Sequence, residues 1–457
     1  MAAEIQQLHF VLFPMVAPGH MNPIIDIAKL LARRGLIVSI ITTPANAARI
    51  GSTISPALQI HLIPIRFPAA EAGLPDACEN IDSLPSLEMS YKFITAFDMM
   101  QNDVVRAFEQ LQPPPSCLIS DMGLPWTTQL ADQFNIPRMV FHGTSCTSLL
   151  TSHHKNANRA EAPYSSDAEA TKSTVMKKVL DQVKAAEKTS YGVVVNSFED
   201  LEAECLKEYS EVKGGRVWCI GPVSLCNVDI SDMAGRGNIS AVDVHDCTKW
   251  LDLHEQGSVI YAALGSLARP MPEQMMELAL ALEESNRPFI WGLGGASSPA
   301  LEGLFVQSGF TQRTRDRGFL IRGWAPQLVI LSHPAIGGFL THCGWNSTLE
   351  GITAGVPLAT WPFVGDQFTN EKLVVEILGI GVSVGNKVSV MWGEEEKAGV
   401  FVAKDAIKRA LIVLMEEGAE MRTRAGELRD KAKMALTQGG SSYSRLTLLI
   451  EEIKARF

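Results

Sequence analysis

Residues 324–367 read WAPQLVILSHPAIGGFLTHCGWNSTLEGITAGVPLATWPFVGDQ, and this stretch determines the fold class. The apolar run Gly337–Thr341 predicts a buried strand, and Trp345–Ala354 predicts a helix. Between them lies a Gly-containing turn, where backbone N–H groups and the positive end of the helix dipole favour an anion. Asp366 and Gln367 close the stretch with acceptors and donors suited to a polyol. The stretch therefore predicts an α/β unit that binds a small anion.

Several side chains around this turn suit a nucleotide. His342 and Ser347 can donate hydrogen bonds to the same anion, and Glu350, one turn later, can accept two hydroxyls of a ribose. Trp324 can stack on a flat base. The alternative is an ordinary packed unit with Trp324 and Trp345 in its core. We favour a binding site because all these groups gather around one helix start.

The beginning of the chain predicts a parallel sheet. His9–Met15 is a short apolar run typical of a buried strand, and residues 17–20 interrupt it. A helical pattern follows, with Asn22 as N-cap and Pro23 at the first helical position. Leu36–Thr42 is apolar and β-branched, so it predicts a second strand. A strand–helix–strand unit of this length indicates a doubly wound sheet.

The same alternation continues to the end of the chain and divides it into two halves. The expected further strands are 116–120, 138–141, 192–196, 217–220, 258–264, 288–291 and 319–323. The expected helices are 89–111, 125–134, 143–150, 174–188, one capped by Ser197, 272–284, 402–416, 421–436 and 441–456, with a surface loop at 153–171. We expect a first domain at 1–222, a linker at 223–247, a second domain at 248–440 and a final helix at 441–457. Ligands of such sheets bind at the carboxyl ends of the strands, here in a cleft between two domains.

Composition excludes several classes of protein. With 457 residues, 46% hydrophobic and 20% charged, the chain is that of a globular protein of two or three domains. Its net charge of −10 and the lack of a basic run argue against a nucleic-acid partner. We see no signal peptide, and no apolar run approaches the roughly 18–20 residues that span a bilayer. The eight cysteines are scattered without a CxxC pair, so we expect free thiols and a cytoplasmic location.

Two residues in the first half are candidates for acid–base chemistry. His20 follows the first strand, where a neutral imidazole near a helix start can act as general base. Asp121 ends another strand of the same sheet and can orient a histidine through Nδ1–H. A turn-capping histidine and a helix N-cap are the alternative interpretations. Two such residues at the carboxyl edge of one sheet strengthen the catalytic interpretation of both.

Other signatures are missing. The chain has no G-x-S-x-G, no Walker-type loop and no D-x-D for a metal-bound diphosphate. The glycines at 292, 294 and 295 are a weak match to a dinucleotide fingerprint. An NAD-dependent oxidoreductase is therefore disfavoured. A non-catalytic nucleotide-sugar binding protein would keep the 324–367 stretch but would not need His20 and Asp121.

The 324–367 stretch resembles the signature box of plant family-1 UDP-dependent glycosyltransferases. That box has the same length, opens with W-A-P-Q, holds H-C-G-W-N-S at its centre and closes with D/E-Q. The resemblance extends over nearly the whole chain, through P-G-H-M-N-P, V-V-N-S-F-E-D-L-E and W-L-D. It implies the GT-B fold, in which two Rossmann-like domains face each other across a cleft and the last helix crosses back to the first domain.

The resemblance also implies a role for each matching residue. Trp324 would stack on uracil, Glu350 would hold the ribose, and His20 with Asp121 would form the catalytic dyad. UDP-binding residues would be Ser266, Trp324, Ala325, Gln327, His342, Gly344, Asn346, Ser347 and Glu350. Sugar-binding residues would be Thr144, Trp345, Asp366 and Gln367. The final Gln, in place of His, is the family's usual mark of UDP-glucose.

The sequence departs from the family pattern near the expected acceptor pocket. Residues 261–264 read YAAL where the family often has a Cys-Phe pair, and the loop after His154 lacks a Pro-Gly-Leu-Pro piece. We expect an inverting glucosyltransferase, a monomer without metal or cofactor, that uses UDP-glucose and a flavonoid, other phenol, terpenoid or hormone. O-glucosides are expected first, and C-glucosides remain open. Residues expected to line the acceptor pocket are Met15, Ile94, Met122 and Phe363.

Overall fold

The computed structural model describes residues 7–76, 78–157, 167–390 and 398–457. The chain forms two compact units. The first comprises residues 1–226 and 435–457, and the second comprises residues 227–434. The division falls a few residues after the expected boundary at 222, and the final helix belongs to the first unit.

The first unit is built on a parallel sheet in the order β3-β2-β1-β4-β5-β6-β7. Its central strands are fully buried, as expected for apolar strands with helices on both faces. The strands are β1 (His9–Phe13), β2 (Ile37–Thr42), β3 (Ile60–Pro64), β4 (Cys117–Asp121), β5 (Arg138–His142), β6 (Gly192–Val195) and β7 (Val217–Cys219).

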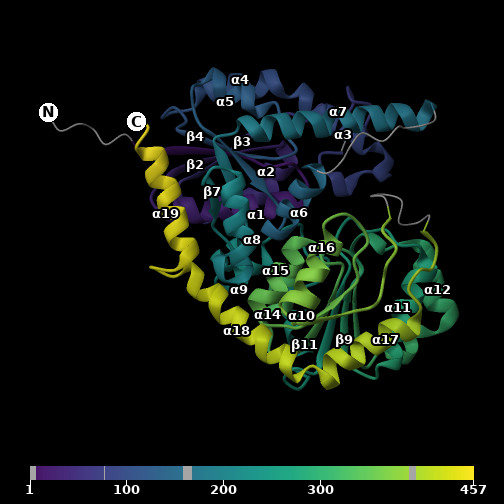
Figure 1. Ribbon diagram of the computed structural model, residues 1–457. Helices are drawn as coiled ribbons and strands as arrows, with labels where there is room; N and C mark the ends of the chain where they lie inside the picture. Colours follow the sequence, from purple (N-terminus) through teal and green to yellow (C-terminus); the bar gives the residue numbers. More distant parts are fainter. Residues whose placement is uncertain (1–6, 77, 158–166, 391–397) are drawn as a thin grey trace. The chain divides into compact units, whose positions relative to one another are not determined.

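Helices cover this sheet, and the C-terminal helix packs against its last strand, β7. Figure 1 shows that last helix in yellow beside the teal strand of the first unit. The helices are α1 (Pro18–Ala32), α2 (Pro44–Gly51), α3 (Ser90–Met99), α4 (Gln101–Gln110), α5 (Thr127–Gln133), α6 (Cys146–Ala157), α7 (Asp167–Thr189), α8 (Glu199–Val212) and α19 (Ser441–Lys454).

The second unit repeats the design with the parallel order β10-β9-β8-β11-β12-β13. The strands are β8 (Val259–Ala263), β9 (Phe289–Gly292), β10 (Gly318–Ile321), β11 (Ile336–Thr341), β12 (Leu358–Thr360) and β13 (Gly381–Ser383). In Figure 1, α10, α14 and α15 cover one face and α11, α12 and α17 cover the other. The helices are α9 (Ile230–Ala234), α10 (Val244–Leu251), α11 (Pro272–Glu284), α12 (Pro299–Ser308), α13 (Phe310–Thr314), α14 (Gln327–Ser332), α15 (Trp345–Ala354), α16 (Gln367–Lys372), α17 (Lys404–Ile412) and α18 (Ala419–Leu436).

Each sheet has one place where the strand order reverses, and this place positions the sites. In the first sheet the reversal lies between β1 and β4, where Phe13 pairs with Ser120. In the second it lies between β8 and β11, where Ala263 pairs with Thr341. Loops that leave two neighbouring strands in opposite directions open a crevice at the carboxyl ends, which is where such sheets bind ligands. His20 and Asp121 follow the first pair of strands, and Ser266 and His342 follow the second.

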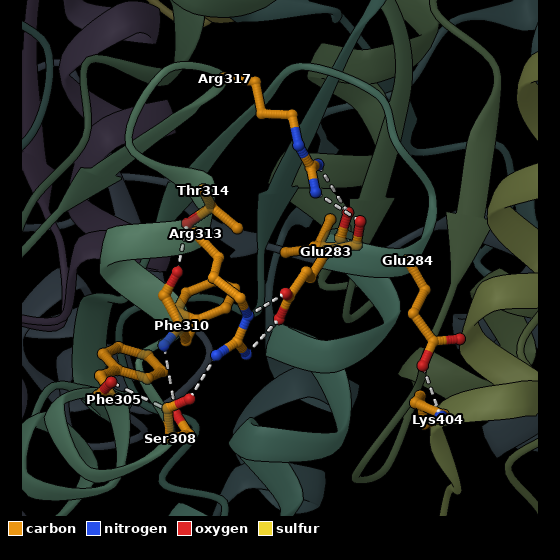
Figure 2. A network of polar contacts seen from close by, with 10 residues as sticks. Glu283, Glu284, Phe305, Ser308, Phe310, Arg313, Thr314, Arg317 and Lys404 are labelled. Carbon is orange, nitrogen blue, oxygen red and sulfur yellow. Dashed lines mark hydrogen bonds and ion pairs between the residues drawn. The ribbon is translucent and has the colours of Figure 1, made fainter.

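A charged network fixes the helices on one face of the second unit (Figure 2). Arg313 on α13 forms a two-pronged ion pair with Glu283 on α11, at 2.5 and 2.9 Å. Arg317 donates to the carbonyl oxygens of Leu282 and Glu283 at the end of α11. Acceptors at a helix C-terminus need such donors because no further turn supplies them.

The first helix begins earlier than expected. Asn22 and Pro23 were expected as N-cap and first helical residue, but α1 begins at Pro18 and contains Pro23. Pro18 is itself suited to the first position, and the N–H groups of His20 and Met21 bond the carbonyl of Ala17. His20 therefore lies in the first helical turn and not in a preceding loop.

Three other expectations were wrong in detail. The helix expected at 89–111 is two helices, α3 and α4, that meet at Met100. The loop expected at 153–171 is helical up to Ala157 and again from Asp167, and its centre lies outside the described residues. Ser197 does not cap α8, because Phe198 holds that position and the Ser197 hydroxyl donates to Glu202.

The segment expected to be a linker is largely structured. It contains a 3₁₀ turn at Val223–Cys226, α9 and the beginning of α10. Asp229 and Asp243 cap the two helices by accepting from backbone N–H groups. The polar composition of this segment indicates a linker, but two of its aspartates act as helix caps.

The hydrophobic core of the second unit includes Phe363. This residue was expected to line the acceptor pocket, but it is 1% exposed and packs on Trp361 and Phe401. The run Leu358–Thr360 that precedes it forms a central strand, so the following aromatic residues turn into the core. No helix in the described part of the chain is long and apolar enough to cross a bilayer.

Candidate functional site

In the first unit, His20 and Asp121 form a hydrogen-bonded pair. Nδ1 of His20 lies 2.6 Å from Oδ2 of Asp121, which is fully buried at the end of β4. The His20 side chain is 33% exposed. A carboxylate at Nδ1 favours the tautomer that carries its proton there, which leaves the lone pair of Nε2 for a substrate proton.

The Asp121 carboxylate is held from its other side as well. Its Oδ1 accepts from the N–H of Gly123 at 2.8 Å. Arg138, itself 3% exposed, donates to Ser120 and Thr127 and reaches the carbonyl oxygen of Asp121 at 3.5 Å. Burial lowers the pKa of Arg138 to about 10, against the opposing effect of the Asp121 and Glu187 charges, so the guanidinium stays positive at neutral pH.

Two partly exposed methionines lie beside the dyad. A Cβ atom on Gly123 would lie 3.1 Å from Met15 Sδ and 3.2 Å from Asp121 Oδ1, which places Met15 beside the carboxylate. Met122 follows Asp121 directly, and both Met15 and Met122 are partly exposed, as is Ile94 on α3. Thr144 is partly exposed in the turn between β5 and α6.

In the second unit, the turn between β11 and α15 has the geometry of an anion site. The helix begins at Trp345, as expected, and Gly344 precedes it. Cys343 adopts a left-handed backbone (φ 63°), an uncommon conformation for a residue with a side chain, and the Asn370 amide donates to its carbonyl oxygen at 3.0 Å. Strain of this kind is kept where the surrounding structure holds it.

His342 is enclosed by two glycines. A Cβ atom on Gly265 would lie 2.7 Å from His342 Nε2, and one on Gly344 would lie 2.5 Å from the same atom. Desolvation lowers the pKa of His342 to about 4, so its ring is neutral at pH 7. Nδ1 is buried and has no hydrogen-bond partner among the described residues. A neutral imidazole with one N–H can donate to a phosphate oxygen without carrying a buried charge.

Glu350 lies at the centre of a buried polar network. It is 4% exposed, and its Oε1 accepts from Arg236 Nη1 at 2.6 Å. Its Oε2 accepts from Gln327 Nε2 at 2.7 Å, and the same amide reaches Ser347 Oγ at 3.2 Å. The hydroxyl of Tyr261 donates to Gln327 Oε1. Gln327 therefore links the residues expected at the ribose and the phosphates.

Trp324 is partly exposed, and its indole N–H is buried without a partner among the described residues. Its ring packs directly on the backbone of Gly237, where a Cβ atom would lie 2.2 Å from Cζ2. Its carbonyl oxygen accepts from the N–H of Ala241 at 2.9 Å. Ala325 packs against Gly292 at the end of β9.

The remaining residues of the expected donor site lie at the same edge of the sheet. Ser266 follows β8, and a Cβ atom on Gly295 would lie 2.7 Å from its carbonyl oxygen. The glycines after β9 thus serve this close packing. Gln367 Oε1 accepts from the N–H groups of Phe363 and Val364 at 2.8 and 3.1 Å. Trp345 is 3% exposed, Asn346 and Asp366 are partly exposed, and Asp366 is the N-cap residue of α16.

Arg236 and Gly237 were not expected at the site. They lie in the segment assigned to a linker, and no motif marks them. Their contacts with Glu350 and Trp324 join residues about 90–115 positions apart in the chain. A local sequence pattern does not predict such contacts, so only the folded structure identifies these two residues.

The chain contains two doubly wound units. One unit carries a His–Asp pair, and the other carries an anion-binding turn beside an indole and a carboxylate. Together these features define a nucleotide-sugar-dependent transferase of the GT-B fold. The family model described as "UDP-glucoronosyl and UDP-glucosyl transferase" matches residues 229–398. The chain is 47% identical to UDP-glycosyltransferase 73C2 of Arabidopsis thaliana, with 98% of this chain and 96% of the relative covered.

Solved structures agree with this likeness. Glycyrrhiza uralensis UGT73P12, complexed with glycyrrhetinic acid 3-O-monoglucuronide, is 34% identical with a TM-score of 0.87 over 98% of this chain and 96% of that one. Arabidopsis thaliana UGT89C1, complexed with UDP-L-rhamnose, is 30% identical with a TM-score of 0.80 over 98% of this chain and all of the other. The chain therefore belongs to the plant family of UDP-glycosyltransferases, enzymes that transfer a sugar from a UDP-sugar.

Proposed function

We propose that this chain is an inverting glucosyltransferase that moves glucose from UDP-glucose to a hydroxyl of a small apolar acceptor such as a flavonoid or another phenol. His20 Nε2 takes the proton of the acceptor hydroxyl. The acceptor oxygen forms a bond to the anomeric carbon while the bond from that carbon to the phosphate oxygen breaks. UDP leaves with the electron pair, and a single displacement inverts the anomeric centre.

The observation that carries this proposal is the 2.6 Å contact between His20 and the buried Asp121 at the strand-order reversal of the first sheet. Asp121 orients the ring and stabilises the imidazolium that forms when His20 accepts a proton. A histidine that only capped a turn would not require a fully buried carboxylate held by a second N–H group.

The leaving UDP is assigned to the second unit. The N–H groups at the start of α15 and the neutral His342 ring are suited to the diphosphate. Ser266, Asn346 and Ser347 add polar groups near the same turn. Trp324 would stack on the uracil ring and Glu350 would accept ribose hydroxyls. Residues 248–440 would thus form the donor domain and 1–222 the acceptor domain.

Glucose is favoured by the polar end of the 324–367 stretch. The two backbone N–H groups that bond Gln367 Oε1 fix the orientation of its amide, and the NH₂ group then remains as a donor for a sugar hydroxyl. Asp366 would supply an acceptor, with Trp345 and Thr144 also near the sugar. One relative was solved with UDP-L-rhamnose, so the donor needs a direct comparison of sugars.

We propose a small apolar molecule as the acceptor. Met15 and Met122 lie next to Asp121 and are apolar, and we propose that Ile94 lines the same pocket. Relatives have been solved with quercetin and with glycyrrhetinic acid 3-O-monoglucuronide. A phenol and a terpenoid are therefore the two acceptor classes to compare. The eight free cysteines fit a reducing compartment, and we propose the cytoplasm.

The test is incubation of the purified chain with UDP-glucose, UDP-galactose or UDP-rhamnose and a panel of phenols, terpenoids and amines. Mass spectrometry would identify the product, and proton NMR would give its anomeric configuration. We expect an acid-labile β-glucoside of a phenol, made fastest from UDP-glucose. An α-glucoside would contradict the inverting mechanism, and preference for another UDP-sugar would contradict the donor assignment.

A further inference from the structure

The segment 236–241, which follows the short helix α9, contacts the two residues assigned to the nucleoside. We propose that Arg236 and Gly237 are positioning residues of the nucleotide site, which hold the Glu350 carboxylate and the Trp324 indole in the orientation that binds uridine. This inference rests on the proposed donor site and adds residues to it that the 324–367 stretch does not contain.

Arg236 and Glu350 form a buried ion pair. The Nη1–Oε1 distance is 2.6 Å, and the side chains are 8% and 4% exposed. A buried ion pair is a weak source of net stability, because desolvation offsets the attraction between the charges. Its value here is orientation, since Arg236 holds Oε1 of the carboxylate while Gln327 holds Oε2.

The carboxylate keeps capacity for a ligand. An ionised carboxylate has about four acceptor positions, and Arg236 and Gln327 occupy one on each oxygen. Two positions therefore remain, which matches the two hydroxyls of a ribose. Loss of Arg236 would leave Glu350 buried and only half paired, so the carboxylate would turn toward other donors or toward water.

Gly237 sets the position of the Trp324 ring, on which the uracil base is proposed to stack. Its φ of +100° is unfavourable for residues with a side chain, and the nearest atom to a Cβ placed there is Trp324 Cζ2, at 2.2 Å. The N–H of Ala241 holds the carbonyl oxygen of Trp324 at 2.9 Å, and a Cβ atom on Gly323 would meet Ala241 at 2.9 Å. The segment thus touches both the ring and the backbone of Trp324. A solvated spacer would need none of these contacts.

The first experiment measures binding of UDP and of 2′-deoxy-UDP to the full chain by calorimetry. In the wild type, loss of one hydrogen bond to a charged group should weaken binding of 2′-deoxy-UDP about 10- to 100-fold. Arg236→Met should weaken UDP binding by a similar factor and reduce the preference for UDP over 2′-deoxy-UDP to near one. Arg236→Lys should recover part of the preference because it keeps the charge.

The matched control is Arg313→Met. It removes an arginine from another ion pair of the same unit, the two-pronged pair with Glu283 on α11 (Figure 2). A merely structural role of Arg236 would lower binding of both nucleotides equally, as would general instability. If Arg236→Met weakened the binding of UDP and of 2′-deoxy-UDP equally, so that the preference for UDP stayed at the wild-type value, the inference would be overturned. A wild-type chain that binds neither nucleotide would instead overturn the proposed donor site.

A double variant tests whether Arg236 acts through Glu350. If it does, Arg236→Met combined with Glu350→Gln should bind UDP no more weakly than Glu350→Gln alone, because the two changes remove one interaction. This variant also avoids an unpaired buried carboxylate, so it should fold where Arg236→Met does not. Independent, additive losses would contradict the assignment.

Gly237→Ala tests the contact with Trp324 separately. We expect at least about 10-fold weaker UDP binding and a changed tryptophan emission, since the indole must move to make room for the methyl group. Gly257→Ala is the control: its φ is also positive (+68°), but a Cβ there meets nothing within 4 Å. Equal effects of the two substitutions would mean that backbone strain, and not the indole contact, is responsible.

Discussion

At the residue scale, the proposed mechanism depends on which nitrogen of His20 carries a proton. The carboxylate of Asp121 lies at Nδ1, and the Gly123 N–H holds the other carboxylate oxygen. The imidazole is thus fixed in position and tautomer before any acceptor arrives. A base that is already oriented loses little entropy when the reaction begins.

Asp121→Asn should therefore reduce the rate of transfer while leaving the donor site intact. The amide oxygen can still accept from Gly123, but the amide cannot stabilise an imidazolium. We expect kcat to fall on the order of 10²–10⁴-fold. The dissociation constant of UDP should stay unchanged by calorimetry. A variant with full kcat would show that Asp121 only caps the following turn.

The desolvated, neutral ring of His342 should make stability depend on pH. Its pKa is about 4 in the folded chain against an ordinary 6.5, so the unfolded chain binds the proton more tightly. Stability due to this group is then complete above pH 6.5 and decreases as the pH falls toward 4. His9 and His254 also have pKa values lowered by burial and add to the same trend.

His342→Gln should consequently flatten the pH dependence of the free energy of unfolding. Denaturant unfolding at pH 7.5 and pH 5 would measure it, with His245→Gln, an exposed histidine of the same unit, as the control. The control should keep the wild-type difference between the two pH values. A His342→Gln variant with the same difference as the wild type would mean that the ring is not held neutral by burial.

At the element scale, the turn between β11 and α15 combines a close approach with a helix start. Gly344 has an ordinary φ of −57°, so a side chain there would cause no backbone strain. The Cβ would, however, lie 2.5 Å from His342 Nε2. The need for glycine at this position is steric and comes from the imidazole.

Gly344→Ala should displace His342 and weaken UDP binding by about 10-fold or more, the effect of losing one or more phosphate contacts. Gly303→Ala is a matched control inside α12, where a Cβ meets nothing within 4 Å. That control should stabilise the chain by about 0.5–1 kcal/mol, because alanine favours a helix over glycine. Calorimetry and denaturant unfolding would measure the two effects.

Elements with strong local signals were predictable from the sequence, and those formed by distant contacts were not. The start of α15 follows from its preceding glycine turn, and β1, β4, β8 and β11 follow from apolar runs. The edge strand Ile60–Pro64 was not predicted from the sequence because it is half exposed and ends in proline. The start of α1 was misplaced because Pro18 and Pro23 both suit a first helical position.

The same distinction holds within the site. His20, Asp121, Glu350 and Trp324 stand at element ends or within a specific motif, so the sequence indicates them. The contact of Arg236 with Glu350 has no local signal, since only the folded second unit brings the two together. Phe363 was misassigned because its apolar character fits a pocket and a core equally well.

At the scale of the whole molecule, the C-terminal helix completes the first unit although the chain has just passed through the second. The Arg34 guanidinium lies 3.5 Å from the centre of the Tyr443 ring and donates to Thr447 Oγ1 at 3.1 Å. Ser442 Oγ donates to the carbonyl oxygen of Gly221 at 2.5 Å. The last residues therefore support the unit that carries the dyad.

Truncation after Gly440 should separate sugar transfer from UDP binding. We expect the first unit to lose stability, because α19 buries Leu446, Leu449 and Ile453. Transfer should fall strongly, whereas UDP should still quench tryptophan emission with nearly unchanged affinity. Equal loss of UDP binding would mean that the second unit also depends on α19.

The most direct test of the catalytic assignment is transfer by His20→Ala under single-turnover conditions, with UDP-glucose binding measured on the same preparation. The predicted result is a loss of transfer of about 10³-fold or more with the dissociation constant of UDP-glucose unchanged, because His20 belongs to the first unit and the proposed nucleotide site to the second. Transfer at the wild-type rate would contradict the role of His20 as the base.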